Sequence, residues 1–311
     1  MSPRGLSTRQ KALVAWLAVC VIWGTTYLGI RISIETLPPF LMAGVRWVVA
    51  GALLAALVRA NGRPFPVAGA RRGVVITGLL LLVVGNGGVV WAEQFVTSGL
   101  TAVIIASSPF WMVTVDALRG GERVTGRTLL GLTVGFAGIV LLVWPALTAG
   151  GSEGRGFLAG VIALQIACAG WALGSSLAKR LSQQQDIFAT TAVQMISAGV
   201  VLLLIGTVAG EWRHLHFSVR SSSALVYLIF VGSIAAYGAY AYALKHLPVA
   251  LVSLYAYINP IIAVALGMIV LDEPFDARMA AAAAIVLVGV ALVHRSGGAR
   301  SGVPARKAAA V

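Results

Sequence analysis

A single arginine lies inside an otherwise apolar stretch and is the first residue whose chemistry needs an explanation. Arg46 stands about eight residues into the apolar segment 38–59. Even the lower insertion scales assign a cost of about 2.5–3.5 kcal/mol to an arginine at that depth in a membrane, so its side chain should not face lipid. We expect Arg46 either to face a cavity and attract a carboxylate or another anionic group, or to form a structural pair with Glu93. The sequence leaves both open.

Two prolines interrupt apolar segments near their middles. Pro109 and Pro260 lack an amide donor and free the carbonyl groups of Ile105 and Ala256. Because an unsatisfied backbone group costs several kcal/mol in lipid, such breaks are tolerated against protein or a wet cavity. We therefore expect a polar cavity at these prolines. The alternative is a packing kink repaired by nearby side chains, namely Ser107, Ser108 or Asn259.

Few other residues offer reactive chemistry. Glu93 and Asp116 are the candidates for proton coupling, which normally uses a buried carboxylate, although both can be structural. No Gly-Lys-Ser/Thr phosphate-binding loop exists, so ATP hydrolysis is not expected. The two cysteines and the pair His214 and His216 lack partners at metal-binding spacing. We expect no metal and no cofactor.

The elements that must position these residues are membrane spans. Of the 311 residues, 59% are hydrophobic and 11% are charged, whereas a soluble domain is about a quarter charged. About 20 apolar residues in helical form cross a bilayer. The sequence predicts an all-α membrane protein whose partner is the lipid bilayer, with ten spans at 12–30, 38–59, 74–93, 98–118, 127–144, 157–179, 187–208, 223–244, 249–271 and 277–294.

The positive charge follows the predicted spans. Of the 23 Lys and Arg residues, Arg46 lies within a span and seventeen lie in segments that are internal if the amino terminus is cytoplasmic. The external segments hold the remaining five, which are Arg31, Arg155, Arg213, Arg220 and Arg278. This asymmetry is typical of a plasma (inner) membrane protein with both termini in the cytoplasm. It also accounts for the net charge of +13, so we expect no nucleic-acid partner.

The chain aligns with itself, which indicates an internal repeat. At an offset of 148 residues, and then of 151, the matched pairs include Cys20 and Cys168, Trp23 and Trp171, Arg46 and Gln194, Pro109 and Pro260, Glu122 and Glu273, and Gly138 and Gly289. Since each half has five spans, an odd number, the second half must enter the membrane from the opposite side. Inverted repeats are a recurrent plan of secondary transporters.

The repeat suggests further cavity residues. Asn86 corresponds to Tyr237, and Tyr255 shares a helical face with Asn259. Trp23 and Trp171 can flank the apolar part of a ligand from symmetric positions. The alternative is that these aromatic residues anchor at membrane interfaces or fill packing gaps. With the prolines, Ser108, Arg46 and Gln194, they complete the predicted binding site.

Several motifs together resemble the EamA family of the drug/metabolite transporter superfamily. They are Trp23-Gly24, Trp91-Ala92-Glu93-Gln94, Ser98-Gly99-Leu100, Ser107-Ser108-Pro109 and Gly121-Glu122, followed by Tyr242-Ala243-Leu244-Lys245, Asn259-Pro260 and Asp272-Glu273-Pro274. The resemblance covers repeats at 12–144 and 157–294, and leaves a basic tail at 295–311 that we expect to be disordered.

The resemblance implies a ten-helix carrier with a cavity among helices 1, 3, 4, 6, 8 and 9. It also implies export of small metabolites, amino-acid-like compounds or drugs by alternating access. An importer or facilitator of the same fold is the first alternative. A membrane-embedded enzyme acting on lipids is the second, but it would need a cluster of acids, histidines or nucleophiles near one interface, which the sequence does not contain. The oligomeric state, including a homo-oligomer, stays open.

Overall fold

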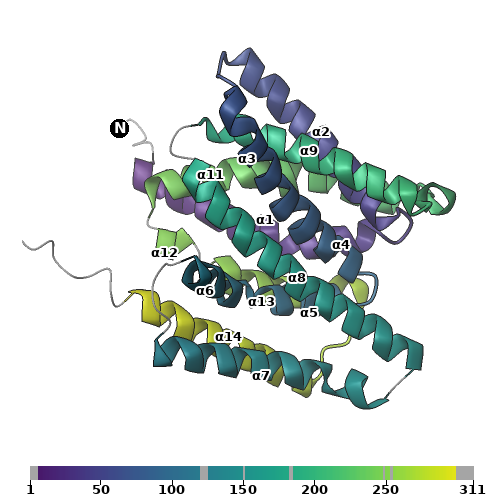
Figure 1. The fold of residues 1–311 in the computed structure, drawn as a ribbon. Helices are drawn as coiled ribbons and strands as arrows, with labels where there is room; N and C mark the ends of the chain where they lie inside the picture. The colour runs from purple at the N-terminus through teal and green to yellow at the C-terminus, as the bar shows by residue number, and fades with distance from the viewer. Residues whose placement is uncertain are drawn as a thin grey trace, which may run out of the picture.

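The computed structural model describes residues 6–119, 125–149, 151–181, 185–247, 249–252 and 255–298, and every regular element in these ranges is a helix (Figure 1). The first half contains α1 (Thr8–Ser33), α2 (Pro39–Ala60), α3 (Ala68–Gly78), η1 (Leu79–Gly87), α4 (Gly88–Ala92), α5 (Ser98–Ile105), α6 (Ser108–Leu118) and α7 (Gly126–Ala149). The second half contains α8 (Gly151–Leu181), α9 (Ile187–Val208), η2 (Glu211–His214), α10 (Val219–Tyr227), η3 (Leu228–Ala235), α11 (Ala236–His246), α12 (Val249–Val252), α13 (Tyr255–Leu271) and α14 (Ala277–Gly298).

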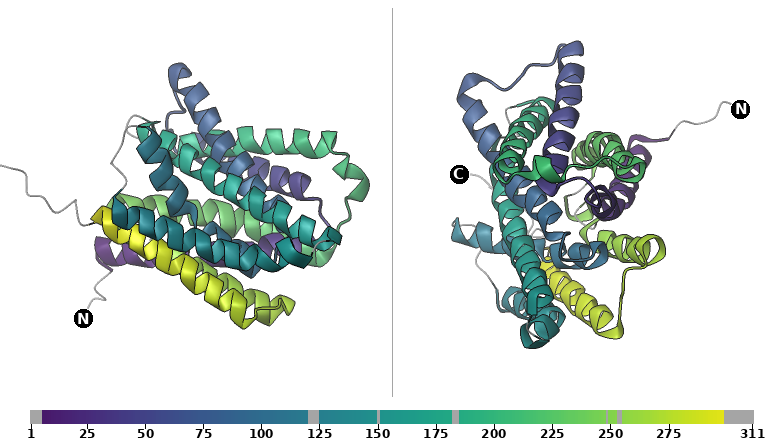
Figure 2. Two further views of the ribbon diagram at one scale, coloured as in Figure 1. Left: turned by 60° about the horizontal axis from the view of Figure 1, so that its bottom comes forward. Right: turned by 90° about the vertical axis from the view of Figure 1, so that its right-hand side faces the viewer.

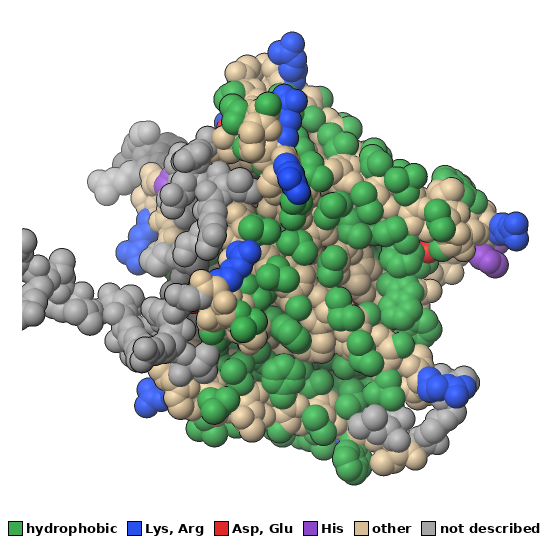
Figure 3. Space-filling view, viewed as in Figure 1, with side chains coloured by type: hydrophobic (Ala, Val, Ile, Leu, Met, Phe, Trp, Pro, Cys, Tyr) green, Lys and Arg blue, Asp and Glu red, His purple; other side chains and the backbone are tan. Residues whose placement is uncertain are grey.

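These helices include long apolar segments at the predicted positions. Within the described residues, eight helical stretches are long and apolar enough to cross a membrane, and two shorter apolar helices follow at Tyr257–Leu271 and Ala277–Val293. Hydrophobic side chains cover much of the face in Figure 3, whereas Lys and Arg lie at its left and right ends and in a row that descends from its top. Large side chains such as Ile162 and Leu204 are 60% and 59% exposed, which suits contact with acyl chains.

Helices α2 and α9, which occupy matching positions in the two halves, pack against each other in opposite directions (Figure 1). A Cβ atom placed on Gly44 would lie 2.8 Å from the Leu203 backbone nitrogen, and one on Gly51 would lie 2.9 Å from that of Ile196. Residue numbers therefore rise along α2 while they fall along α9. Such close approach needs glycine at the crossing, as in other small-residue contacts between membrane helices.

The last helices of the two halves, α7 and α14, form a second antiparallel pair, which lies together in Figures 1 and 2. Gly131 faces Gly289 and Val293, whereas Gly138 faces Ala282 and Val286. In the sequence, the glycines of this segment and the alanines at 280–284 form stripes of small residues, and in the structure these stripes bring the two backbones together. The pair lies along one side of the molecule and serves as scaffold.

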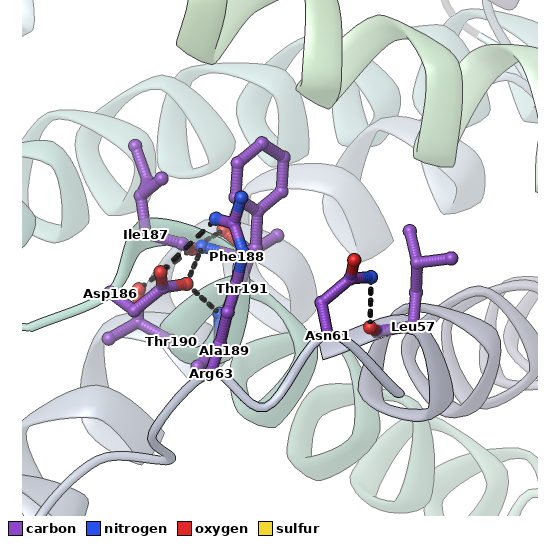
Figure 4. Close-up of polar contacts among 9 residues, drawn as sticks. All are labelled: Leu57, Asn61, Arg63, Asp186, Ile187, Phe188, Ala189, Thr190 and Thr191. Atoms are coloured by element: carbon purple, nitrogen blue, oxygen red, sulfur yellow. Dashed lines mark hydrogen bonds and ion pairs between the residues drawn. The ribbon is translucent and has the colours of Figure 1, made fainter. Parts of the chain in front are cut away.

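The end of α2 is joined to the start of α9 by one ion pair (Figure 4). Asp186 is the N-cap residue of α9, where its Oδ1 atom accepts from the backbone nitrogens of Phe188 and Ala189 at 2.9 and 3.0 Å. Its Oδ2 atom lies 3.2 Å from Nη1 of Arg63, whose guanidinium also covers the Phe188 ring. A carboxylate at a helix N-terminus satisfies amides that have no helical partner.

The helices extend beyond some of the predicted segments. Helix α7 continues to Ala149 and α8 begins at Gly151, whereas the apolar spans within them lie at Gly126–Pro145 and Gly154–Ala178, close to the predicted 127–144 and 157–179. Helix α14 continues to Gly298, so residues 295–298 are helical although the sequence predicted disorder from Arg295. The helices exceed the predictions because hydropathy ends a span where apolar residues end, whereas backbone hydrogen bonding continues through polar and small residues. Residues 299–311 lie outside the described residues.

Candidate functional site

A cavity of about 180 Å³ lies between the two halves of the molecule. Its walls come from α1, α2, η1, α4, α5 and α6 of the first half and from α8, η3, α11 and α13 of the second. Ten of the eleven predicted binding residues line it, namely Trp23, Arg46, Asn86, Ser108, Pro109, Trp171, Tyr237, Tyr255, Asn259 and Pro260. The sequence therefore located residues that the fold brings to one place.

Pro109 lies at the start of α6, immediately after a real break in the helix. Helix α5 ends at Ile105 and α6 begins at Ser108. The Ser108 hydroxyl donates to the Ile105 carbonyl at 2.5 Å, and the Ser107 hydroxyl donates to the Ile104 carbonyl at 2.6 Å. Serine side chains thus repair the break, as one alternative predicted, and the same break lines the cavity, as the other predicted.

Pro260 lies inside α13 and also lines the cavity. The amide of Asn259 can be oriented so that its nitrogen donates to the carbonyls of Tyr255 and Cys20, each at 3.0 Å. Tyr255 is four residues earlier in the same helix, whereas Cys20 belongs to α1. Asn259 therefore ties α13 to the first half, whereas Pro260 lies within a continuous helix and neither acceptor is the Ala256 carbonyl that it frees.

Two π-helical segments lie at corresponding places in the halves and face the same cavity. The segment η1 contributes Gly85 and Asn86, and η3 contributes Gly232. The Asn86 side-chain oxygen accepts from Trp47 Nε1 at 3.2 Å. Such wide turns are rare and are frequently found at functional sites. The sequence predicted regular helices here, because no local pattern of apolar residues distinguishes a π-helical turn from an α-helical one.

Arg46 is held at the cavity wall by a buried serine from η3. Its side chain is only 2% exposed, and its Nε atom donates to Ser233 Oγ at 3.0 Å. Its Cζ atom lies 4.4 Å from the centroid of the Trp47 ring, a cation–π contact. The Nη1 atom is buried without a hydrogen-bond partner. No ion pair within 4.0 Å joins Arg46 to Glu93 in the described part of the chain, so the predicted structural pair is absent.

Aromatic rings from both halves form one wall of the cavity. The Trp23 ring centroid lies 4.9 Å from that of Tyr255 and 5.8 Å from that of Tyr237, both in edge-to-face geometry. Trp171 lines the cavity opposite Gly85, where an added Cβ would lie 3.3 Å from its ring. For these residues, the structure agrees with the cavity alternative rather than with interfacial anchoring.

The two predicted coupling carboxylates have different surroundings. Glu93 follows α4 and is completely buried, yet neither of its carboxylate oxygens has a hydrogen-bond partner. Arg31 donates a hydrogen bond to its backbone carbonyl. Asp116, near the end of α6, is exposed and lies outside the cavity lining.

Gln194 is the one predicted binding residue that does not line the cavity. It is half-buried on α9, and an added Cβ on Gly78 would lie 2.7 Å from its Cα atom. Its side chain therefore lies at the contact between α9 and α3. The repeat pairs Gln194 with Arg46 in the sequence. In the structure, however, the Arg46 side chain extends toward η3, whereas Gln194 lies where α9 crosses α3.

Two further carboxylates connect the halves, and the sequence did not single out either contact. Glu273, just after α13, accepts from the Ser98 backbone nitrogen at 2.8 Å, the Ser98 hydroxyl at 2.9 Å and the Gly99 backbone nitrogen at 3.1 Å. Glu211 in η2 accepts from the backbone nitrogens of Phe40 and Leu41 at 3.2 and 2.8 Å. Each satisfies amides at the N-terminus of a helix in the other half. The pairing of Glu273 with Glu122 in the repeat was the available signal.

Comparisons with known proteins agree with this fold. The EamA-like transporter family matches residues 10–144 and 158–295. The Escherichia coli (strain K12) protein named "Uncharacterized inner membrane transporter YedA" is 38% identical over 256 residues, which are 81% of this chain and 80% of that protein. Another protein of the same strain, named "Probable amino-acid metabolite efflux pump", is 22% identical over 91% of this chain and 94% of its own length.

A solved structure titled "Crystal structure of protein" has a TM-score of 0.61 and 19% sequence identity over 92% of this chain and 97% of its own. This likeness shows a shared fold. The family match covers both halves of the chain, and relatives in the family carry transporter names. The chain therefore belongs to the EamA-like transporter family and is a multi-pass membrane transporter rather than an enzyme.

Proposed function

We propose that the chain is an inner-membrane secondary carrier that exports small metabolites, amino-acid-like compounds or drugs by alternating access. The observation that carries this proposal is a cavity lined by both halves and by the helix prolines Pro109 and Pro260. A binding site of this kind, between two similar units, can open to either side when the units rock against each other. The relative named as an amino-acid metabolite efflux pump supports the outward direction.

The proposed architecture is ten spans arranged as two inverted five-helix repeats. Support comes from the antiparallel contacts of matching helices, α2 with α9 and α7 with α14. The first residues of α5 likewise meet the end of α13, where Ser98 and Gly99 donate to Glu273. Two matching helix pairs that both run in opposite directions, α2 with α9 and α7 with α14, are what a two-fold axis in the membrane plane would produce.

The proposed orientation places both termini in the cytoplasm. It rests on the charge distribution, because five basic residues lie in the external segments and seventeen in the internal ones. A reporter that is active only outside the membrane should be active when fused after Gly150 and silent when fused after Gly120. The reverse pattern would overturn the orientation.

In this orientation, the contacts of Glu273 and Glu211 lie at the outer end of the molecule, where each joins the two halves. They support a state that is closed to the outside. A depression at the same end is lined by Arg31, Glu35, Gln94, Asp272 and Glu273, and it is separate from the central cavity. For export, the Glu273 contact would have to open.

Glu93 is our proposed coupling carboxylate in preference to Asp116. A negative charge is costly on a carboxyl group that is fully buried and accepts no hydrogen bond. Arg31, Arg46 and Glu273 act on it electrostatically, so substrate binding at Arg46 can influence its proton. Facilitated diffusion without a coupled ion is the alternative.

Transport by purified protein in lipid vesicles tests the proposal. Vesicles containing the protein would be loaded with a panel of labelled metabolites and drugs. Release would be compared with that from loaded vesicles without protein and from vesicles containing the double variant Pro109→Ala and Pro260→Ala. We expect release of at least one small compound and its loss in the double variant. Counterflow then separates a carrier from a one-way release path. If no compound moves, or if the double variant transports as well as the unaltered protein, the proposal fails.

A further inference from the structure

We propose that the transported compound is a monocarboxylate with an uncharged aromatic or apolar body, and that Arg46 binds its carboxylate. This inference rests on the carrier function proposed above and names its substrate class. Four features of the cavity support it: the free side of the guanidinium, the way it is held, the walls and the volume.

The first feature is an unused hydrogen-bond donor on a buried cation. The Arg46 side chain is 2% exposed, and its Nη1 atom has no partner, although the Nε atom donates to Ser233. No described carboxylate lies within 4.0 Å of it. A buried charge without a counter-ion is strongly unfavourable. An incoming anion would therefore gain both charge compensation and a vacant hydrogen bond.

The second feature is that the guanidinium is held in place before a ligand arrives. Ser233 is completely buried, accepts from Arg46 Nε at 3.0 Å and donates to the Leu228 carbonyl at 2.9 Å. The π-helical turn of η3 places this hydroxyl toward α2. The Trp47 ring covers one face of the guanidinium. A planar, immobilised fork of this kind matches the two oxygens of a carboxylate.

The third feature is the chemistry of the remaining walls. The Trp23 ring is in edge-to-face contact with those of Tyr237 and Tyr255, and Trp171 also lines the cavity. Among the described residues that line the cavity, Arg46 is the single charged side chain. An ammonium group would have no carboxylate partner there, and a second carboxylate would have no second cation. The walls thus favour one negative charge on an otherwise apolar molecule.

The fourth feature is size. A volume of about 180 Å³ is below the range of roughly 300–1,000 Å³ typical of pockets for drug-sized ligands. A single aromatic ring with a short side chain is therefore a suitable probe. Four compounds share that body and differ in charge: 3-phenylpropionate (anion), 3-phenylpropanamide (neutral), phenylalanine (zwitterion) and phenethylamine (cation).

The test measures binding of these four probes to the purified full-length protein by calorimetry. In the unaltered protein, we expect 3-phenylpropionate to bind at least tenfold more tightly than each of the other three. Arg46→Gln should remove that advantage by weakening the carboxylate at least tenfold while changing the amide less than twofold. Arg46→Lys should keep part of this advantage of the carboxylate over the amide, since a lysine retains the positive charge but not the paired N–H donors of the guanidinium. The control, Arg59→Gln, alters an exposed arginine on the same helix and should change nothing.

Several results would overturn the inference. They are equal binding of the carboxylate and the amide, tighter binding of phenylalanine or phenethylamine, absence of binding by 3-phenylpropionate, or an equal loss for carboxylate and amide in Arg46→Gln. If Arg46→Gln does not fold, the four-probe comparison on the unaltered protein still decides. Vesicle transport separates this inference from the carrier proposal. Transport of phenethylamine alone would contradict only the proposed carboxylate specificity. Binding of 3-phenylpropionate without transport of any compound would contradict only the proposed carrier function.

Discussion

Two glutamates at the same end of the molecule have opposite surroundings. Glu273 accepts three hydrogen bonds from Ser98 and Gly99, so its charge is compensated by a helix N-terminus. Glu93 is fully buried, and its carboxylate oxygens accept none. The comparison separates a carboxylate that connects two halves from one whose position costs stability and therefore points to function.

The geometry around Glu273 explains why it is fixed. Asp272 adopts a positive φ of 52°, which ends α13 at Leu271 and lets the Glu273 nitrogen donate to the Gly267 carbonyl at 3.1 Å. Gly267 has no side chain, and a methyl group there would overlap Glu273 Oε2. The conformations at Gly267, Asp272 and Glu273 thus direct the Glu273 carboxylate toward α5. No comparable arrangement supplies hydrogen-bond donors to the Glu93 carboxylate in the described part of the chain.

The largest effect should come from Glu273→Ala. It leaves the Ser98 and Gly99 amides without partners, and each orphaned buried group costs about 1–3 kcal/mol. We expect the melting temperature of the detergent-solubilised protein to fall by roughly 5 °C or more. Glu35→Ala is the control at the same end, because its ion pair with Arg220 at 3.2 Å is solvent-exposed and such pairs contribute under about 1 kcal/mol. Equal effects of the two variants would remove the proposed distinction.

Gly267→Ala should have a smaller effect of the same kind. The added methyl displaces the Glu273 carboxylate, which can keep some of its hydrogen bonds by moving. We expect a lower melting temperature, and no further loss when Gly267→Ala is added to Glu273→Ala, since both act on one contact. Gly238→Ala, in α11 with no atom within 4 Å of the added group, is the control. Additive losses in the double variant would show that Gly267 acts independently of Glu273.

Glu93→Gln should not lower the melting temperature, because it replaces a buried carboxylate that accepts no hydrogen bond with a neutral group of similar size. Transport should become independent of pH in this variant, whereas the unaltered protein should show a pH dependence. The measurement is vesicle transport across pH 5–9 alongside thermal unfolding. A destabilised variant with unchanged pH dependence would place Glu93 with Glu273 as a structural residue.

Asp272→Gly should have the smallest effect, and it should be favourable. Glycine adopts the left-handed conformation without the strain that a side chain introduces, and the gain is about 1 kcal/mol or less. We expect a slightly higher melting temperature, whereas Asp272→Ala should show no gain because the side-chain strain remains. Destabilisation by the glycine would indicate that the Asp272 carboxylate contributes to the contact of Glu273 with α5.

The spans, the small-residue helix contacts and most of the cavity could be predicted from the sequence. Apolar length determines a membrane helix, and a proline removes a hydrogen bond wherever it lies, so Pro109 and Pro260 indicated the site directly. The repeat added further cavity residues to the prediction by pairing Trp23 with Trp171, and both line the cavity.

The remaining features depend on which elements meet in space. The π-helical turns of η1 and η3 leave no periodic signal, so the contact of Arg46 with Ser233 was not predictable. Gln194 shows the limit of the repeat, because equivalent positions on α2 and α9 do not face the same neighbours. The donors to Glu273 come from a helix 174 or 175 residues away in the chain, which no local pattern can reveal.

Access to the cavity from both sides of the membrane tests the central claim most directly. In protein with Cys20→Ala and Cys168→Ala, the variant Ser108→Cys would place one thiol at the cavity wall. A membrane-impermeant thiol reagent would be applied to right-side-out and to inverted vesicles. Alternating access predicts labelling from both sides and protection from both sides by a transported compound. Labelling from one side only, or from neither, would contradict it.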